Sequence, residues 1–360
     1  MPRVNPIVGI GAAAVVGIAG VMYGKSYIAD AKEGFLAEEA KLPESAITTY
    51  LNHLKDGDYE GVYQDSLIVD PHLNSEADYT AKLQEVYGDI DPSKVEFAGL
   101  DDADGSKEYK LYYEGKFLAT LKLIKSTDGS WLASTIFSGD KDYTIEVPTG
   151  LSITANGIDV DKSYLTSTKV PASNFSGLAD QDDAPVVDVY QLNGLLGEPE
   201  VKVKGDDSYG TLRDVVTSTI YVGKKTDDAE LAQTMIDDAE ICASFPAQEA
   251  TAGQVLAISV PGSDWYDRIG GMQNQWFTTP TSSKFSNQSA TNIIQQSDDT
   301  MVGYVTFDYY ATNGEVERTW YGGYQMTFLN VNGTWKIAGM GIDNELNPEH
   351  ADYFEKLNAG

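Results

Sequence analysis

The pattern of apolar and polar positions changes from a helical to a strand-like period at about residue 95. Before that point, apolar side chains at helical spacing predict three helices, at residues 44–54, 59–63 and 76–87. Alternating runs separated by turn-forming residues then predict four strands, at residues 95–100, 108–113, 117–124 and 131–137. Helices followed by an antiparallel meander indicate an α+β domain over residues 44–140.

The last third of the chain repeats this order. A helix is predicted over Asp227–Cys242, where Glu230 follows Asp227 by three positions as in a capping box, and strands are expected at residues 302–311, 316–330 and 335–340. Residues 123–133 align with residues 327–337 without a gap, and both segments carry Asp-Gly or Asn-Gly followed by Ser-Trp or Thr-Trp. We therefore expect a duplicated fold, with a second α+β domain at residues 207–345 and a tail at 346–360.

The segment between the two predicted domains, residues 141–206, has a different pattern. Short apolar runs predict strands at residues 143–147, 151–155, 186–192 and 201–203. Asn156-Gly157 between Ile153 and Ile158 is a strong hairpin signal, because both turn positions need left-handed backbone. We expect a small all-β module here.

The N-terminal segment Ile7–Tyr23 is apolar on every face and would span about 26 Å as a helix. It predicts a membrane anchor within residues 1–24, followed by a helical stalk at 25–43; the alternative is a cleaved signal peptide, after which the protein is secreted. Gly9, Ala13 and Gly17 form a small-residue stripe that would let two anchors pack as a homodimer, or the anchor is simply rich in Gly and Ala.

The net charge of the chain limits the classes of partner that it is expected to bind. Its 55 acidic residues against 25 Lys and Arg give a net charge of −30, the wrong sign for a nucleic-acid binder. The imbalance belongs to residues 25–360, because residues 1–24 contain no acid. We expect a partner that is neutral, cationic or held in a desolvated pocket, and no nucleic acid.

Candidate chemistry is sparse. Cys242 is the single cysteine and lies on an apolar helix stripe, so we interpret it as a core residue. The three histidines are too scattered for a zinc site, and each is expected at the surface: His53, His72 and His350. The acidic runs at 101–105, 180–183 and 206–207 are interpreted as solvated turns. No catalytic, cofactor-binding or metal-ligating residue is assigned.

Two aromatic-rich strands, at residues 304–310 and 320–324, could line a pocket in the second α+β domain. Aromatic faces with a few polar tips suit sugars or peptides, although core packing would explain many of these side chains as well. Gly322-Gly323 inside a strand indicates a bulge or a close backbone approach. The candidate ligand residues are Tyr304, Tyr324, Trp320 and Trp276.

Residues 44–137 resemble the nuclear-transport-factor-2-like (NTF2-like) domain found N-terminal to penicillin-binding transpeptidases. The resemblance rests on core and turn positions: Ala46, Tyr50-Leu51, Gly57-Asp58-Tyr59, Val62-Tyr63, Tyr79, Leu83, Val86-Tyr87 and Asp128-Gly129-Ser130-Trp131. Residues 227–342 share it more weakly. It implies two cone-shaped domains, separated by the β module, in a membrane-anchored envelope protein of Gram-positive bacteria. No Ser-x-x-Lys is present and Lys225-Thr226-Asp227 departs from Lys-Thr-Gly, so the transpeptidase itself is absent.

These observations lead to an expected function. We expect a single-pass cell-membrane protein whose extracytoplasmic domains bind a cell-envelope polymer, peptide or protein without catalysis. The outward orientation rests on the resemblance, because Lys25 and Lys32 after the anchor outnumber Arg3 before it. One alternative is an enzyme that uses a cone pocket, which a carboxylate buried beside a Tyr or His inside a cone would favour; another is a purely structural assembly or spacer subunit.

Overall fold

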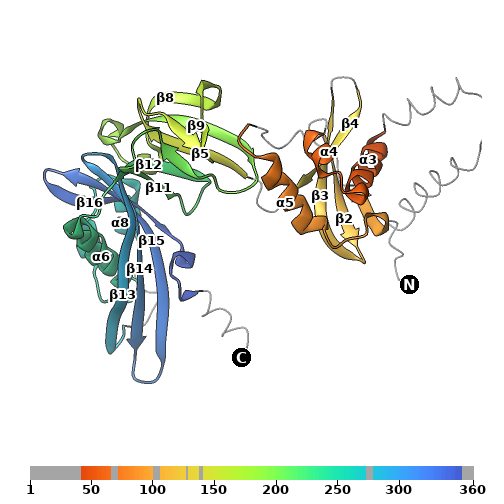
Figure 1. Ribbon diagram of the computed structural model, residues 1–360. Coiled ribbons are helices and arrows are strands. Elements are labelled where there is room, and N and C mark those ends of the chain that lie inside the picture. The colour runs from red at the N-terminus through yellow and green to blue at the C-terminus, as the bar shows by residue number, and fades with distance from the viewer. Residues whose placement is uncertain are drawn as a thin grey trace, which may run out of the picture. The chain divides into compact units, whose positions relative to one another are not determined.

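The computed structural model describes residues 42–65, 72–99, 106–126, 129–137, 141–272 and 279–350 (Figure 1). The chain divides into two compact units, the first comprising Met1–Lys141 with Asn193–Glu198 and the second Asp142–Leu192 with Pro199–Gly360. Both are mixed α+β. No helix in the described ranges is long and apolar enough to cross a membrane, and the predicted anchor, stalk and Gly9/Ala13/Gly17 stripe lie outside those ranges.

The first unit follows the predicted order of helices and strands. Its helices are α3 (Pro43–Asp56), α4 (Tyr59–Gln64) and α5 (Glu76–Tyr87), and a 3₁₀ turn at Pro92–Lys94 leads into the sheet. The sheet is an antiparallel meander in the order β1-β2-β3-β4, formed by Val95–Gly99, Ser106–Tyr113, Lys116–Lys125 and Trp131–Ile136. Asp58 and Ser75 accept backbone N–H groups at the starts of α4 and α5, which fixes where each helix begins.

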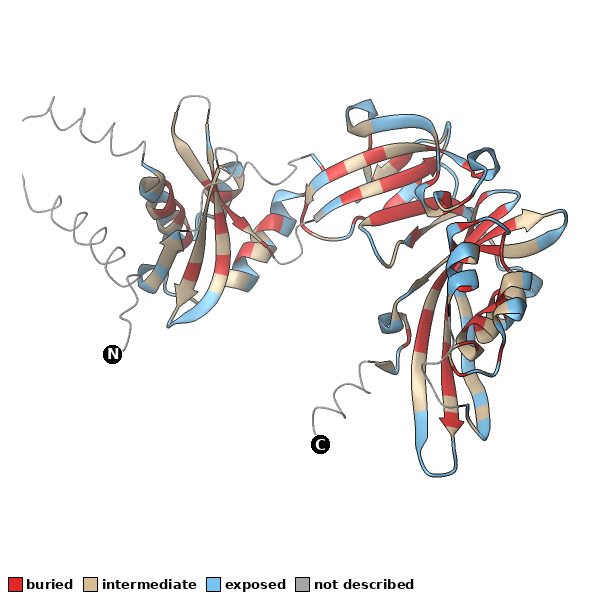
Figure 2. Ribbon diagram, turned by 180° about the vertical axis from the view of Figure 1, so that it is seen from behind, coloured by how far each residue is buried: buried red, intermediate tan, exposed pale blue. Residues whose placement is uncertain are grey.

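The core of the first unit lies between these helices and the sheet, where buried residues line the facing strands (Figure 2). The hydroxyls of Tyr50 and Tyr87 both meet the hydroxyl of Thr135, so these buried polar groups are hydrogen-bonded. The buried Asn74 donates from Nδ2 to the carbonyl of Gly194 at 2.8 Å and accepts at Oδ1 from the N–H of Leu196 at 3.0 Å. This pair of bonds fixes the Asn193–Glu198 segment to the unit and places Leu196 in its core.

The second unit is built on a nine-stranded sheet in the order β16-β15-β14-β13-β12-β5-β9-β8, with β11 also paired to β12. Apart from the parallel pair β5–β12, the registered pairs are antiparallel. Its strands are β5 (Lys141–Pro148), β8 (Leu165–Pro171), β9 (Val186–Leu195), β11 (Tyr209–Arg213), β12 (Thr219–Lys225), β13 (Ser282–Ser297), β14 (Thr300–Thr312), β15 (Glu317–Val331) and β16 (Thr334–Ile342).

A small three-stranded sheet, β10-β6-β7, completes the unit with strands Val201–Val203, Ile153–Ala155 and Ile158–Asp159. Strands from residues 141–206 and from residues 207–345 therefore share one sheet, joined at the β5–β12 pair. The helices of the second unit are α6 (Ala229–Ser244), α7 (Ala252–Ala257) and α8 (Asp264–Gly271), and short 3₁₀ turns lie at Lys162–Tyr164, Ser173–Phe175, Gln181–Asp183 and Asn344–Leu346.

The two hairpins that match in sequence close differently. Asn332 and Gly333 form a two-residue turn with φ of 54° and 84°, and Val331 pairs directly with Thr334. In the first unit, the N–H of Ser126 donates to the carbonyl of Ser130 at 2.8 Å, so three positions separate the bonded residues. The sequence match therefore fixes the position of each turn but not its length. The predicted Asn156-Gly157 hairpin is confirmed, with φ of 53° and 79°.

The sequence did not predict β13, the 16-residue strand of the second unit. Its residues are largely polar and exposed, and its register against β14 shifts three times. Asn287 and Asn292 lie near two of these shifts with φ of 53°, a left-handed backbone that Asn tolerates well. Bulges of this kind break the alternation on which the prediction of a strand depends.

Helix α6 begins at Ala229, two residues after the predicted start at Asp227. The side chain that caps it is Asp228, which accepts from the N–H groups of Glu230 and Leu231, rather than Asp227. The predicted apolar stripe is largely confirmed: Met235, Ala239 and Cys242 are buried in the core. Burial raises the pKa of the Cys242 thiol to about 12, as expected of a core cysteine rather than a reactive one.

Asp238 is buried on the same helix, and this predicts a pH effect on stability. Burial, reinforced by the charge of Asp237 and opposed by Lys336, raises the pKa of Asp238 to about 7. The native state then holds this proton more tightly than the unfolded chain, so stability falls as the pH rises toward 7 and stays low above it. The advantage of D238N over the wild type should grow by about 2 kcal/mol between about pH 5.5 and about pH 8.

Urea denaturation of the second unit at several pH values measures this difference. The exposed neighbour Asp227, which does not cap the helix, provides the control variant D227N. If the free energy of unfolding of D238N and of D227N depends on pH in the same way, Asp238 does not cause the loss of stability at higher pH.

Candidate functional site

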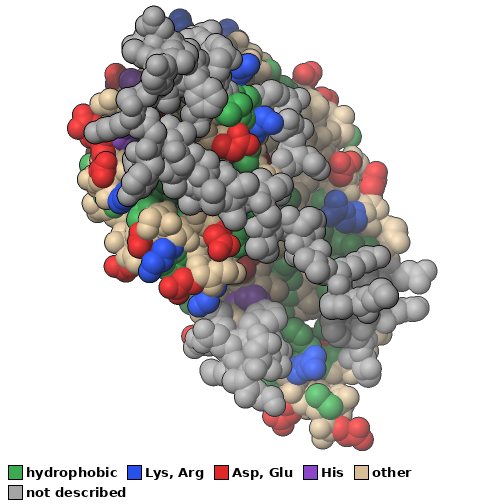
Figure 3. Space-filling view, turned by 90° about the vertical axis from the view of Figure 1, so that its right-hand side faces the viewer, with side chains coloured by type: hydrophobic (Ala, Val, Ile, Leu, Met, Phe, Trp, Pro, Cys, Tyr) green, Lys and Arg blue, Asp and Glu red, His purple; other side chains and the backbone are tan. Residues whose placement is uncertain are grey.

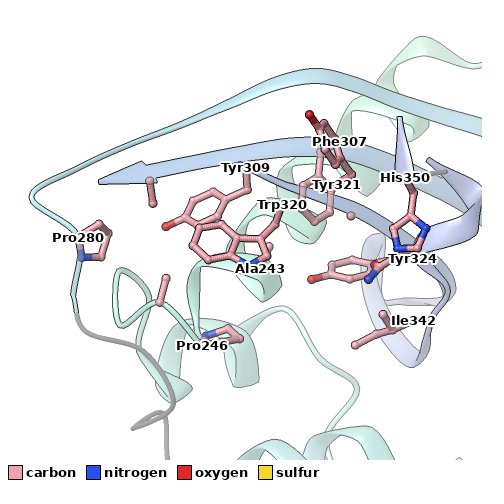
Figure 4. Close-up of a pocket in the computed structure, with 14 residues that line it drawn as sticks. Ala243, Pro246, Pro280, Phe307, Tyr309, Trp320, Tyr321, Tyr324, Ile342 and His350 are labelled. Atoms are coloured by element: carbon pink, nitrogen blue, oxygen red, sulfur yellow. The ribbon is translucent and has the colours of Figure 1, made fainter. Parts of the chain in front are cut away.

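A pocket of about 390 Å³ opens in the second unit, on the face of the sheet formed by β14 and β15 (Figure 4). The end of α6 and the residues that follow it form the opposite wall, with Pro280 at one end and His350 at the other. Its lining is mostly aromatic and small: Ala243, Pro246, Ala247, Pro280, Phe307, Tyr309, Ala311, Trp320, Tyr321, Gly322, Tyr324, Ile342, Asn344 and His350.

Strand register explains why the rings gather there. Tyr309 pairs with Trp320 and Phe307 with Gly322 across the β14–β15 ladder. Side chains two residues apart on a strand share a face, so Tyr324 joins them on the same side of the sheet. The ring centroids of Tyr309 and Trp320 are 5.8 Å apart, and those of Phe307 and Tyr324 are 5.1 Å apart.

The two glycines in β15 make room for this arrangement. A Cβ on Gly322 would lie 2.4 Å from the ring of Phe307, and one on Gly323 would lie 2.1 Å from the carbonyl oxygen of Asp343. The β14–β15 register is continuous through both positions, so they serve close approach and not a bulge. Gly322 leaves room for the ring of Phe307, and Gly323 leaves room for the chain that follows β16.

That chain, Asp343–His350, forms a C-terminal strap across the sheet. The N–H of Asp343 donates to the carbonyl of Gly323 at 2.9 Å. The buried Asn347 then directs its Nδ2 at three acceptors: the carbonyl of Phe307 at 3.0 Å, Oδ1 of Asp308 at 3.2 Å and the carbonyl of Gly322 at 3.3 Å. Asn347 thereby fixes the strap to both pocket strands and holds Asn344 and His350 at the pocket wall.

The hydroxyl of Tyr309, a lining residue, is hydrogen-bonded to a carboxylate beside the pocket. It donates to Oε2 of Glu249, whose other oxygen accepts from the hydroxyl of Ser283 at 2.6 Å. Burial and this hydrogen bond raise the pKa of Tyr309 above its ordinary range. Burial also raises the pKa of Tyr324, so both phenols keep their protons at neutral pH. None of the described lining residues is Lys, Arg, Asp or Glu.

Two of the four predicted ligand residues lie in the pocket wall. Trp320 and Tyr324 line the pocket, whereas Trp276 lies outside the described residues. Tyr304 is not among the lining residues, because it lies an odd number of residues from Tyr309 on β14 and so faces the other side of the sheet. It pairs with Gln325 and packs beside Leu212 and Tyr221. Its hydroxyl donates to the carbonyl of Arg213.

The histidine predictions need correction at two positions, His350 and His53. His350 was expected at the surface but is partly buried in the pocket wall, because Asn347 folds the strap back onto the sheet. His53 is also partly buried and lines a cavity of about 240 Å³ in the first unit with Tyr50, Thr49 and Ser130. Its Nδ1 lies 2.7 Å from Oδ2 of Asp58. Hydrogen bonds from the N–H of Gly61 and from His53 lower the pKa of Asp58.

Besides Tyr309 and Glu249, a second tyrosine–carboxylate pair bears on the enzyme alternative, with Asp214 beside the buried Tyr221. Asp214 accepts from the hydroxyl of Tyr221 at 2.9 Å, but it also accepts from the N–H groups of Val216 and Thr217 and from Nε2 of Gln325. Burial alone would raise the pKa of Asp214, and these hydrogen bonds together lower it. Neither Asp214 nor Tyr221 lines one of the cavities above, so the pair fixes the β11–β12 connection to β15.

The acidic runs form turns where they are described. Asp180 caps the 3₁₀ turn Gln181–Asp183, and Asp206 accepts from the N–H and hydroxyl of Ser208, whereas 101–105 lies outside the described residues. Within the described ranges no group of three or more His, Cys, Asp or Glu side chains could hold a metal ion. Acidic and basic side chains are interspersed over the face that Figure 3 shows.

Comparison with known proteins gives a weak likeness among solved structures. No family model and no curated protein matches the chain. Among solved structures, it is similar to an "Ntf2 like protein involved in plasmid conjugation", with 9% sequence identity and a TM-score of 0.25, over 69% of this chain and 76% of that one. At this TM-score the likeness carries no argument about the fold, which rests on the observed elements and registers.

Asn347 provides a test of the pocket's construction. In N347D a carboxylate would face two carbonyls and Asp308, so we expect the free energy of strap opening to fall by about 2 kcal/mol. Hydrogen exchange should show lost protection at the N–H groups of Asp343 and Leu346, with the β14–β15 ladder still protected. Unchanged exchange at these two amides would contradict the role given to Asn347.

Proposed function

We propose that the chain is a non-enzymatic binding protein whose second unit holds a small ligand in the aromatic pocket. The pocket itself is the observation that carries this proposal. Its volume of about 390 Å³ and its mainly aromatic lining are those of a small-molecule site. Rings such as Trp320 and Tyr324 can stack on the apolar face of a ligand, and Asn344 and His350 can orient it by hydrogen bonds.

A binding role accounts for the polar pairs better than catalysis does. The oxygens of Asp214 are occupied by backbone and side-chain donors, and Asp58 caps helix α4 while holding His53. Each pair thus has a structural task. The Glu249 carboxylate that accepts from Tyr309 is exposed, and the described lining of the pocket offers His350 but no carboxylate. These observations support recognition over proton transfer as the use of the pocket.

We further propose that both units are NTF2-like cones, since each places helices before an antiparallel meander: α3–α5 before β1–β4, and α6–α8 before β13–β16. The apolar run Ile7–Tyr23 would anchor them at the cell membrane of a Gram-positive bacterium, with Gly9, Ala13 and Gly17 available for pairing of two anchors. The anchor would confine the pocket near an envelope polymer, peptide or protein that carries the ligand group.

The binding proposal is tested with N-phenyl-1-naphthylamine, a neutral aromatic probe that fluoresces in apolar sites. The wild type should bind it, and W320L should weaken binding about tenfold or more, because Trp320 forms much of the pocket wall. The matched control is F117L, which removes an exposed ring from the first unit. No saturable binding, or equal loss in both variants, would contradict the proposal.

Location is tested by protease digestion of cells from which the wall has been removed. If the anchor is retained and the two units are outside, added protease should degrade them while a cytoplasmic marker survives. The alternative of a secreted protein predicts recovery of the chain from the medium, without the apolar run Ile7–Tyr23. Protection of the units until the cells are lysed would contradict the proposed orientation.

A further inference from the structure

Charged side chains lie just outside the aromatic pocket, in contrast to its described lining. The aromatic rings present π faces, which carry negative electrostatic potential and attract a cation placed over them. The described lining residues include no Lys, Arg, Asp or Glu. The charge preference of the site therefore depends on its rings and on the charged groups just outside it.

Glu249 is the charged group most directly coupled to the pocket. Its exposed carboxylate accepts a hydrogen bond from the hydroxyl of Tyr309, and the hydroxyl of Ser283 donates to its other oxygen at 2.6 Å. A carboxylate in this position adds a negative charge at the pocket wall. It also pushes electron density into the Tyr309 ring, which strengthens attraction of a cation to that face.

The opposing charge is Arg318, which lies two residues before Trp320 on β15. It lines an adjoining cavity of about 100 Å³ with Asn313, Val316 and Trp320, and not the main pocket. Arg318 is exposed, as are Glu315 and Glu317 beside it in the sequence, so water and these acids screen it. The net charge of −30 adds a long-range preference of the same sign as Glu249.

We propose that the aromatic pocket selects cationic ligands, namely those that carry a quaternary ammonium group on an apolar body. The inference rests on the proposed binding function and specifies its ligand class. A primary ammonium needs strong hydrogen-bond acceptors for its three N–H groups at once, and the described lining has no carboxylate to supply them. A quaternary ammonium has no N–H groups and is weakly hydrated, so it can leave water for aromatic faces at small cost.

The test uses two competitors of nearly equal shape against bound N-phenyl-1-naphthylamine: phenyltrimethylammonium, which is cationic, and tert-butylbenzene, which is neutral. In the wild type at low salt, the cation should displace the probe at about a tenfold lower concentration. E249Q keeps an acceptor for Tyr309 but removes the charge, so it should reduce the cation's advantage about fivefold. Its affinity for tert-butylbenzene should stay unchanged.

The control variant is E240Q, which removes a carboxylate of α6 that accepts from Gln288 and lines none of the cavities above. It should leave the cation's advantage at the wild-type value. Equal displacement by the two competitors, or an E249Q variant with undiminished preference, would overturn the charge inference while leaving the binding function standing. Absence of probe binding in the wild type would instead refute the binding function itself.

Discussion

The antiparallel register of β14 against β15 is the constraint on which the candidate site depends. With Tyr309 opposite Trp320 and Phe307 opposite Gly322, one face of the hairpin carries the aromatic wall. A slip of one residue would turn these rings to the other side of the sheet. The ladder is continuous over the length of both strands, which fixes the face more firmly than any single side-chain contact. The neighbouring strand β13 tolerates shifts in register because its residues do not line the pocket.

A wall of rings becomes a pocket only when a second surface faces it. Helix α6 and the residues after it provide one such surface, and the C-terminal strap provides the other. The strap follows β16 directly and is held by backbone and amide hydrogen bonds to Gly323, Phe307 and Gly322. These bonds replace contacts with water, so each contributes only about 1 kcal/mol to stability. Their main effect is geometric, because by holding the strap in place they set the depth of the pocket.

The sequence predicts the parts of this fold that local rules control. Helices of the first unit, the Asn156-Gly157 hairpin and the burial of Cys242 follow from spacing, turn chemistry and an apolar stripe. The alternation of faces along β14 could also have shown that Tyr304 and Tyr309 lie on opposite sides of the sheet, because positions an odd number of residues apart face opposite sides of a strand. The sequence holds no comparable signal for β13, whose Asn bulges break the alternation.

His350 and Asn347 were missed for a related reason. They enter the site through a return of the chain onto the sheet, and that return depends on long-range contacts to β14 and β15 that no local pattern reports. The negative charge, by contrast, was evident from composition, and the position of Glu249 beside Tyr309 gives it a specific consequence at the pocket.

The central claim, that the aromatic pocket is the binding site, is tested most directly by ¹⁹F NMR of protein labelled with 5-fluorotryptophan. The chain has five tryptophans, and W320F assigns the resonance of Trp320. Titration with phenyltrimethylammonium should shift that resonance saturably and leave the resonance of Trp131 in the first unit unchanged. A titration that shifts Trp131 alone, or no tryptophan at all, would contradict the claim.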